Sequence, residues 1–145
     1  MPERTAPVHP PSLDDLAAWA EAAYAELPES FRRLTADIVF RVDEFPDEET
    51  EREMELESPF DLMGLYRGVS LDRKSVSGGA DDVDYVFLYR RPILDYWCET
   101  GEDLKHVVRH VLIHEIGHHF GLSDEDMEAI EARPDEAAGR TGGEP

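Results

Sequence analysis

Two histidines and a glutamate in the C-terminal third of the chain have the types and the spacing of a metal-dependent site. His114 and His118 are four residues apart, so in a helix they lie on one face, separated by about 6 Å along the axis. Two imidazoles at that spacing can bind one ion. Glu115 lies about 100° around the helix, where it can reach a water beside the ion. This H-E-x-x-H arrangement indicates an ion with a carboxylate base next to it.

A third ligand is expected, because a catalytic zinc site usually combines three protein ligands with one position open to water. Gly121 should end the helix and let the backbone reverse, so that Asp124 can present an oxygen to the same ion. Glu125 and Asp126 are the alternatives for this ligand. Two imidazoles and one carboxylate suit zinc, although iron, cobalt or manganese could accept the same donors.

The motif has a competing interpretation, because the same five residues also occur on exposed helices with salt bridges. Here the helix face below the motif is apolar at Val107 and Val111, so both histidines should continue a buried stripe, where a metal can satisfy them. His110 lies four residues before His114, but no carboxylate follows it. We interpret His110 as a packing residue or as a residue that supports a ligand. His119 points about 100° away from His118, so we do not expect it to bind the ion.

A long helix over residues 102–120 must position these side chains. Its apolar stripe consists of Leu104, Val107, Val108 and Val111. Gly117 should let a sheet or a neighbouring turn approach this helix closely. Ser123 can cap a last helix over 124–132, in which Met127 is expected to be a core residue.

The preceding chain should supply a small sheet and further helices. Helical spacing and a cap at Ser12 predict a first helix that ends at Pro28. The other expected elements are a helical turn at 31–34, a strand at 37–43, a helix at 48–55, a strand at 65–69, a polar connection at 71–82, a strand at 83–90 antiparallel to the previous one, and a helix at 92–97. The fold class predicted is α+β, with the long helix packed on the sheet.

Composition limits the classes of partner. The 145 residues include 14 lysines and arginines against 34 aspartates and glutamates, a formal charge of −20. Such a surface repels phosphate backbones and anionic membranes, so we expect no nucleic-acid and no membrane partner. The N-terminus lacks the apolar stretch of a secretory signal, and cytoplasmic localisation is the default expectation.

The length predicts one domain, 12–132, between an N-terminal tail at 1–11 and a C-terminal tail at 133–145. The single cysteine, Cys98, excludes an intramolecular disulfide, and its aromatic neighbours predict a partly buried thiol.

Three segments resemble the small bacterial minimal zincin metallopeptidase family: FDLMGLYRG (60–68), YRRPIL (89–94) and HEIGHHFGLSDEDM (114–127). The resemblance covers about Leu34 to Glu131. It implies zinc bound by His114, His118 and Asp124, with Glu115 as general base. It also implies a small mixed sheet over the motif helix.

The function that we predict is zinc-dependent hydrolysis of peptide bonds in a peptide or protein substrate, with a water activated by the ion and Glu115 as the base. Two rival hypotheses are a non-catalytic, metal-stabilised module that binds proteins and an amidase that acts on a small molecule. The presence of Glu115 favours catalysis, because a purely structural site has no need of a base.

An oxyanion-stabilising residue is also expected, and Tyr66, Tyr89 and Arg90 are the candidates from the strand region. The strand at 65–69 could hold an extended peptide at its edge by β-augmentation.

Overall fold

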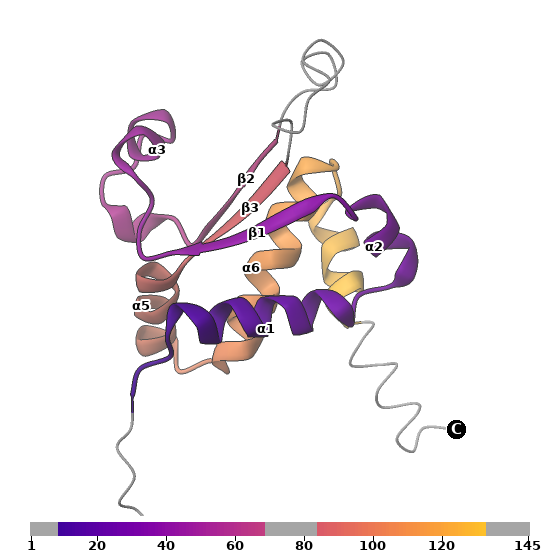
Figure 1. The fold of residues 1–145 in the computed structure, drawn as a ribbon, viewed down its shortest axis with the longest axis horizontal. Helices are drawn as coiled ribbons and strands as arrows, with labels where there is room; N and C mark the ends of the chain where they lie inside the picture. Colours follow the sequence, from indigo (N-terminus) through magenta and orange to yellow (C-terminus); the bar gives the residue numbers. More distant parts are fainter. Residues whose placement is uncertain (1–8, 69–83, 133–145) are drawn as a thin grey trace, which may run out of the picture.

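The longest helix, α6 (Leu104–His119), packs against a small sheet and lies at the centre of the fold (Figure 1). The structure is a computed structural model that describes residues 9–68 and 84–132. The predicted connection at 71–82 and the predicted tail at 133–145 lie outside these residues, as does most of the predicted N-terminal tail. The domain boundaries therefore stay a prediction.

The sheet of the described residues contains β1 (Ile38–Asp43), β2 (Gly64–Arg67) and β3 (Asp84–Tyr89) in the order β1-β3-β2. β3 pairs in parallel with β1 and antiparallel with β2. The α+β class, the small mixed sheet and the antiparallel pairing of β2 with β3 are confirmed. β2 is an edge strand within this sheet.

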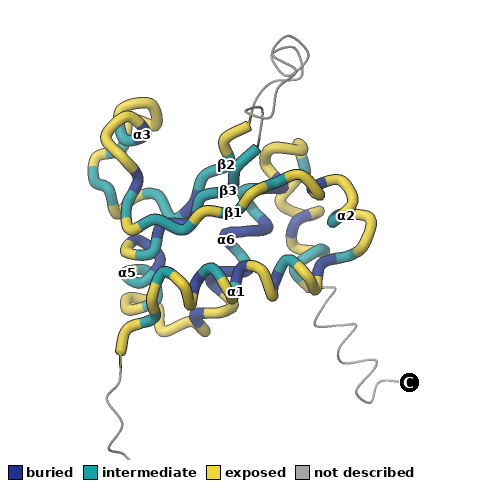
Figure 2. Tube along the Cα trace, in the orientation of Figure 1, coloured by how far each residue is buried: buried dark blue, intermediate teal, exposed yellow. Residues whose placement is uncertain are grey.

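The two faces of the sheet differ because side chains alternate along each strand. The inner face carries the fully buried Val86 and Leu88 of β3 and packs against α6 and α1 (Leu13–Ala25). Figure 2 shows the buried segment of α6 behind this face. The outer face carries Tyr85, Phe87 and Tyr89 in a row along β3, of which only Tyr89 is buried.

The first helices hold the edge strand β1 in place. Ser12 caps α1, as the sequence predicts, and it forms a reciprocal capping box with Asp15. The short helix α2 (Glu29–Leu34) follows. Tyr24 of α1 packs edge-on against Phe40 of β1, with ring centroids 5.2 Å apart, and its hydroxyl donates to the Arg32 carbonyl. These contacts fix the orientation of α1 against the sheet.

Two further helices lie beside the strand ends. α3 (Glu48–Glu53) projects over the outer face and begins at Asp47, whose carboxylate accepts a hydrogen bond from the Thr50 amide. A 3-10 turn, η1 (Pro59–Asp61), precedes β2. The helix α5 (Arg90–Thr100) is longer than the predicted 92–97 segment, because it starts directly at the end of β3 and continues to Gly101.

The chain reverses after α6 and forms a last helix over 124–132, which lies beside α6 (Figure 1). Gly121 has a φ of +73°, the left-handed conformation expected at its position. A Cβ on Gly117 would overlap the Sδ and Cγ atoms of Met127, and Met127 is fully buried. Gly117 thus permits close packing of the last helix.

Two sequence expectations about exposure are wrong. Cys98 is exposed, because α5 turns this residue away from the core. His118 is exposed as well, and the buried face of α6 near its end consists of Leu112, Ile113 and Ile116 instead.

In the described ranges, none of the helices combines the length and the apolarity needed to cross a membrane.

Candidate metal centre

The end of α6 and the start of the last helix bring three donor side chains together. One ligand atom from each of His114, His118 and Asp124 lies within 4.8 Å of the other two. The two histidines come from consecutive turns of α6, and the left-handed Gly121 reverses the chain toward the aspartate. The geometry therefore permits one ion to contact all three.

His114 is the most enclosed of these donors. Its Nε2 atom is buried without a hydrogen-bond partner among the described residues, although Glu131 Oε2 lies 3.4 Å away in poor geometry. Burial lowers the pKa of His114, and so does the nearby imidazole of His110. A buried nitrogen that stays neutral and lacks a hydrogen bond has the character of a metal ligand.

A second donor group shares His114. His110 Nδ1 lies 2.9 Å from Glu131 Oε2, and the ligand atoms of His110, His114 and Glu131 fall within 4.8 Å of one another. The rings of His110 and His114 are 4.0 Å apart between centroids. Sequence reasoning treated His110 as a supporting residue and missed Glu131. A signal was present, since Asp124 and Glu131 are seven residues apart and share one face of the last helix.

The side chain of Glu115, a residue of α6, packs against the edge strand β2. A Cβ on Gly64 would come within 3.2 Å of the Glu115 Cγ, so the glycine leaves room for this side chain. Burial raises the pKa of Glu115 to about 7, and a hydrogen bond from the Tyr66 backbone limits the rise. A carboxyl group with this pKa can take up and release a proton near neutral pH.

The contacts of the other carboxylates after Gly121 distinguish them from Asp124 as the third ligand. Asp126 forms a capping box with Ser123, with distances of 3.0 and 3.2 Å, so its carboxylate has a structural role. Neither Asp126 nor Glu125 belongs to a donor group of the described residues. Asp124 is therefore the carboxylate of this segment that converges with the histidines.

The oxyanion candidates also differ. Arg90 donates to the Pro11 carbonyl at 2.6 Å and to Glu44 at 2.9 Å, contacts that hold the N-terminal segment. Tyr66 faces α6, donates its hydroxyl to Asp84 at 2.9 Å, and stacks on the exposed His119 with centroids 3.9 Å apart. Tyr89 lies on the outer face of the sheet. Of the three, Tyr66 is on the same side of the sheet as the donor group.

The donor set fits zinc. Two imidazole nitrogens and one carboxylate oxygen are ligands that zinc commonly has in hydrolytic sites. His118 and Asp124 are exposed, so the side of the group away from His114 is open to solvent. Such a site has room for a water or a substrate oxygen.

Comparison with known proteins identifies the family of the chain. No curated protein sequence matches the chain. A family model described as zincin-like metallopeptidase matches residues 35–133, which include the whole sheet, α6 and the donor residues. This match covers more than half of the chain, and the chain therefore belongs to the zincin-like metallopeptidase family.

Proposed function

We propose that this protein hydrolyses peptide bonds with a zinc ion held by His114, His118 and Asp124 and with Glu115 as general base. The observation that carries the proposal is the convergence of the three donors beside a partly buried carboxylate whose pKa is raised to about 7. A zinc ion bound there would lower the pKa of a water and polarise the scissile carbonyl.

The residues of the chain would divide the remaining work. Glu115 takes the proton of the attacking water and passes it to the leaving amine nitrogen. A hydrogen bond from the Tyr66 backbone, which lowers the pKa of Glu115, would orient the carboxylate against β2. The Tyr66 side chain, stacked on His119, is the best placed of the three oxyanion candidates.

The edge strand β2 is the proposed substrate platform. The edge of β2 that faces away from β3 has no partner strand in the described part of the chain, so an extended peptide could pair with it. Glu115 lies directly against this strand. A peptide on β2 would therefore pass close to the base.

The test combines metal content with hydrolysis. Wild-type protein reconstituted with zinc is expected to hold one ion and to cleave members of a peptide library. Glu115→Gln should retain the ion and lose cleavage by about 100-fold or more, because only the base is removed. Cleavage that survives this change would contradict the role of Glu115. Bound zinc without any hydrolysis in the wild type would favour the non-catalytic module.

The ligand assignment needs its own variants. Asp124→Ala should weaken zinc binding by at least about tenfold, whereas Glu125→Ala, the matched exposed neighbour, should leave it unchanged. Glu131→Gln should have a smaller effect than Asp124→Ala if the ion sits in the His114, His118 and Asp124 group. A larger loss in Glu131→Gln would move the ion to the group that contains His110.

A further inference from the structure

A cavity of about 470 Å³ lies on the outer face of the sheet, between the strands and α3. This volume is within the range of small-ligand sites, which is about 300 to 1,000 Å³. The donor group at the end of α6 does not line this cavity. The cavity is therefore a separate feature whose lining can be considered by itself.

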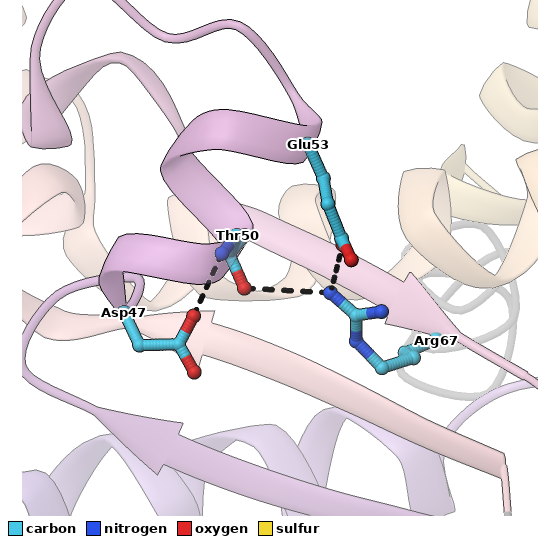
Figure 3. A network of polar contacts seen from close by, with 4 residues as sticks. All are labelled: Asp47, Thr50, Glu53 and Arg67. Carbon is cyan, nitrogen blue, oxygen red and sulfur yellow. Dashed lines mark hydrogen bonds and ion pairs between the residues drawn. The ribbon is translucent and has the colours of Figure 1, made fainter.

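The lining carries an excess of negative charge. Asp43, Asp47 and Glu49 contribute carboxylates. The one basic residue of the lining is Arg67, whose guanidinium is already bound to Glu53 at 2.9 Å and lies 3.4 Å from the Thr50 hydroxyl (Figure 3). Arg67 therefore leaves the carboxylates of the cavity without full compensation, and a cation would be attracted to it.

Aromatic rings form the rest of the wall. Phe87 and Tyr89 lie nearly parallel along β3, at an interplanar angle of 6°, and Phe45 joins them from the loop before α3. Ring faces attract ammonium and guanidinium groups. The chain itself already uses this contact nearby, since the guanidinium of Arg91 lies 5.5 Å from the centroid of the Phe45 ring.

Tyr89 supplies a polar group that the fold does not use. The residue is only 2% exposed, and its hydroxyl has no hydrogen bond to any residue in the described ranges. Burial and the neighbouring Asp43 and Asp47 raise the pKa of Tyr89 to about 12, so the phenol stays neutral. The hydroxyl therefore has capacity to accept a hydrogen bond at the cavity wall, and a ligand with N–H donors would supply one.

We propose that this cavity binds the cationic side chain of an arginine or lysine in an extended peptide, between the carboxylates of Asp43 and Asp47 and the rings of Phe87 and Tyr89. An arginine fits best, because its planar guanidinium can stack on a ring while it donates to carboxylates.

The position of the cavity relative to β2 connects it with a peptide. Arg67 of β2 faces the cavity, whereas the preceding residue, Tyr66, faces α6 and contacts Glu115 through its backbone. An extended peptide paired with β2 also alternates its side chains between the two faces. One side chain could thus enter the cavity while the backbone passes Glu115. This peptide placement rests on the proposed function, whereas binding of the cation does not.

The experiment measures binding without cleavage. Short, capped Ala–Ser peptides with one central arginine, or with the neutral isostere citrulline, are titrated into full-length Glu115→Gln protein, with and without zinc. The arginine peptide should bind at least about tenfold more tightly than the citrulline peptide, because charge-assisted hydrogen bonds form only with arginine. This preference should weaken as salt is added.

Substitutions test which residues cause the preference for the arginine peptide. Asp43→Asn with Asp47→Asn should abolish the preference, and asparagine at position 47 can still cap α3. Tyr89→Phe should reduce it several-fold. Asp95→Asn, an exposed carboxylate on α5, is the matched control and should leave it unchanged. Thermal unfolding of each variant checks that the fold is retained.

The outcomes separate this inference from the proposed function. Equal affinity for both peptides, or a preference that survives the double substitution, would overturn the cation site. If the wild type cleaves peptides but the arginine and citrulline peptides bind the Glu115→Gln protein equally, the cation site is refuted while the peptidase proposal stands. If the preference depends on Asp43 and Asp47 but no peptide is cleaved, the site stands and the peptidase proposal fails.

Discussion

Glu115 is a partly buried carboxyl group, and in the metal-free protein its ionisation opposes folding. Burial raises its pKa from an ordinary value of 4.5 to about 7 in the folded chain. Below pH 4.5 the group is protonated in both the folded and the unfolded state. Between these pH values only the unfolded state loses the proton, so the free energy of unfolding falls as pH rises. Above pH 7 the loss is complete.

Glu115→Gln should therefore stabilise the metal-free protein above pH 7, by on the order of 2 kcal/mol. Glutamine can still accept the Tyr66 backbone hydrogen bond, and it carries no charge. Urea unfolding in the presence of a chelator, repeated from below pH 4.5 to above pH 7, measures the effect. The advantage should grow over this interval and then stay constant. A stability difference between the variant and the wild type that does not change with pH would contradict a raised pKa of Glu115.

His114 shows how one residue can serve two donor groups. The residue belongs both to the group with His118 and Asp124 and to the group with His110 and Glu131, and its buried Nε2 lies 3.4 Å from Glu131 Oε2. Glu131 is thus close enough either to support the ligand His114 or to compete for it, which is why its substitution is informative.

Among the elements, the pair formed by α6 and the last helix determines the geometry of the centre. Gly117 on α6 and the fully buried Met127 on the last helix are in such close contact that no side chain can stand between them. This contact sets the distance between the histidines on one helix and Asp124 on the other.

Gly117→Ala should lower the free energy of unfolding by about 1 to 3 kcal/mol, because the new methyl group forces Met127 or the whole last helix away. Zinc affinity should fall as well, since Asp124 moves with that helix. In a double-mutant cycle with Met127→Ala, the losses should be less than additive. Chemical denaturation and zinc titration measure both effects, and strict additivity would mean that the two side chains do not conflict.

Much of this arrangement can be predicted from local sequence signals. Ser12, Gly121 and Ser123 mark helix ends through capping chemistry that involves only a few neighbouring residues. The four-residue spacing of His114 and His118 fixes their common face. These features are local, so a pattern within one segment is sufficient to identify them.

Other features depend on contacts between distant segments and have no local signal. The parallel pairing of β1 with β3 joins Ile38 to Asp84, and the intervening chain gives no indication of it. The exposure of His118 depends on how α6 is rotated against the sheet. The cavity on the outer face forms only where α3 meets β2 and β3, so neither the acidic segment nor the strands reveal it alone.

At the scale of the whole molecule, the charge of −20 on 145 residues is the dominant electrostatic property. Carboxylates repel one another more in the folded state than in an expanded chain. Salt reduces this repulsion, since the screening length is about 10 Å at 0.1 M ionic strength.

The melting temperature of the metal-free protein should therefore rise as salt is added at neutral pH. Sodium chloride and choline chloride should act alike if the effect is general screening. A rise with sodium alone would indicate a specific cation site. A fall in melting temperature with both salts would mean that local ion pairs, such as Arg67 with Glu53, outweigh the overall repulsion.

The donor residues on either side of Gly121 have a consequence for the end of the domain. An ion bound as proposed would join the final helical segment, 124–132, to α6 through Asp124 as well as through Met127. The free energy of zinc binding would then contribute directly to the folding stability of that segment. Amide hydrogens there should exchange with solvent at rates governed by zinc availability, while those of α1 and β3 should respond far less.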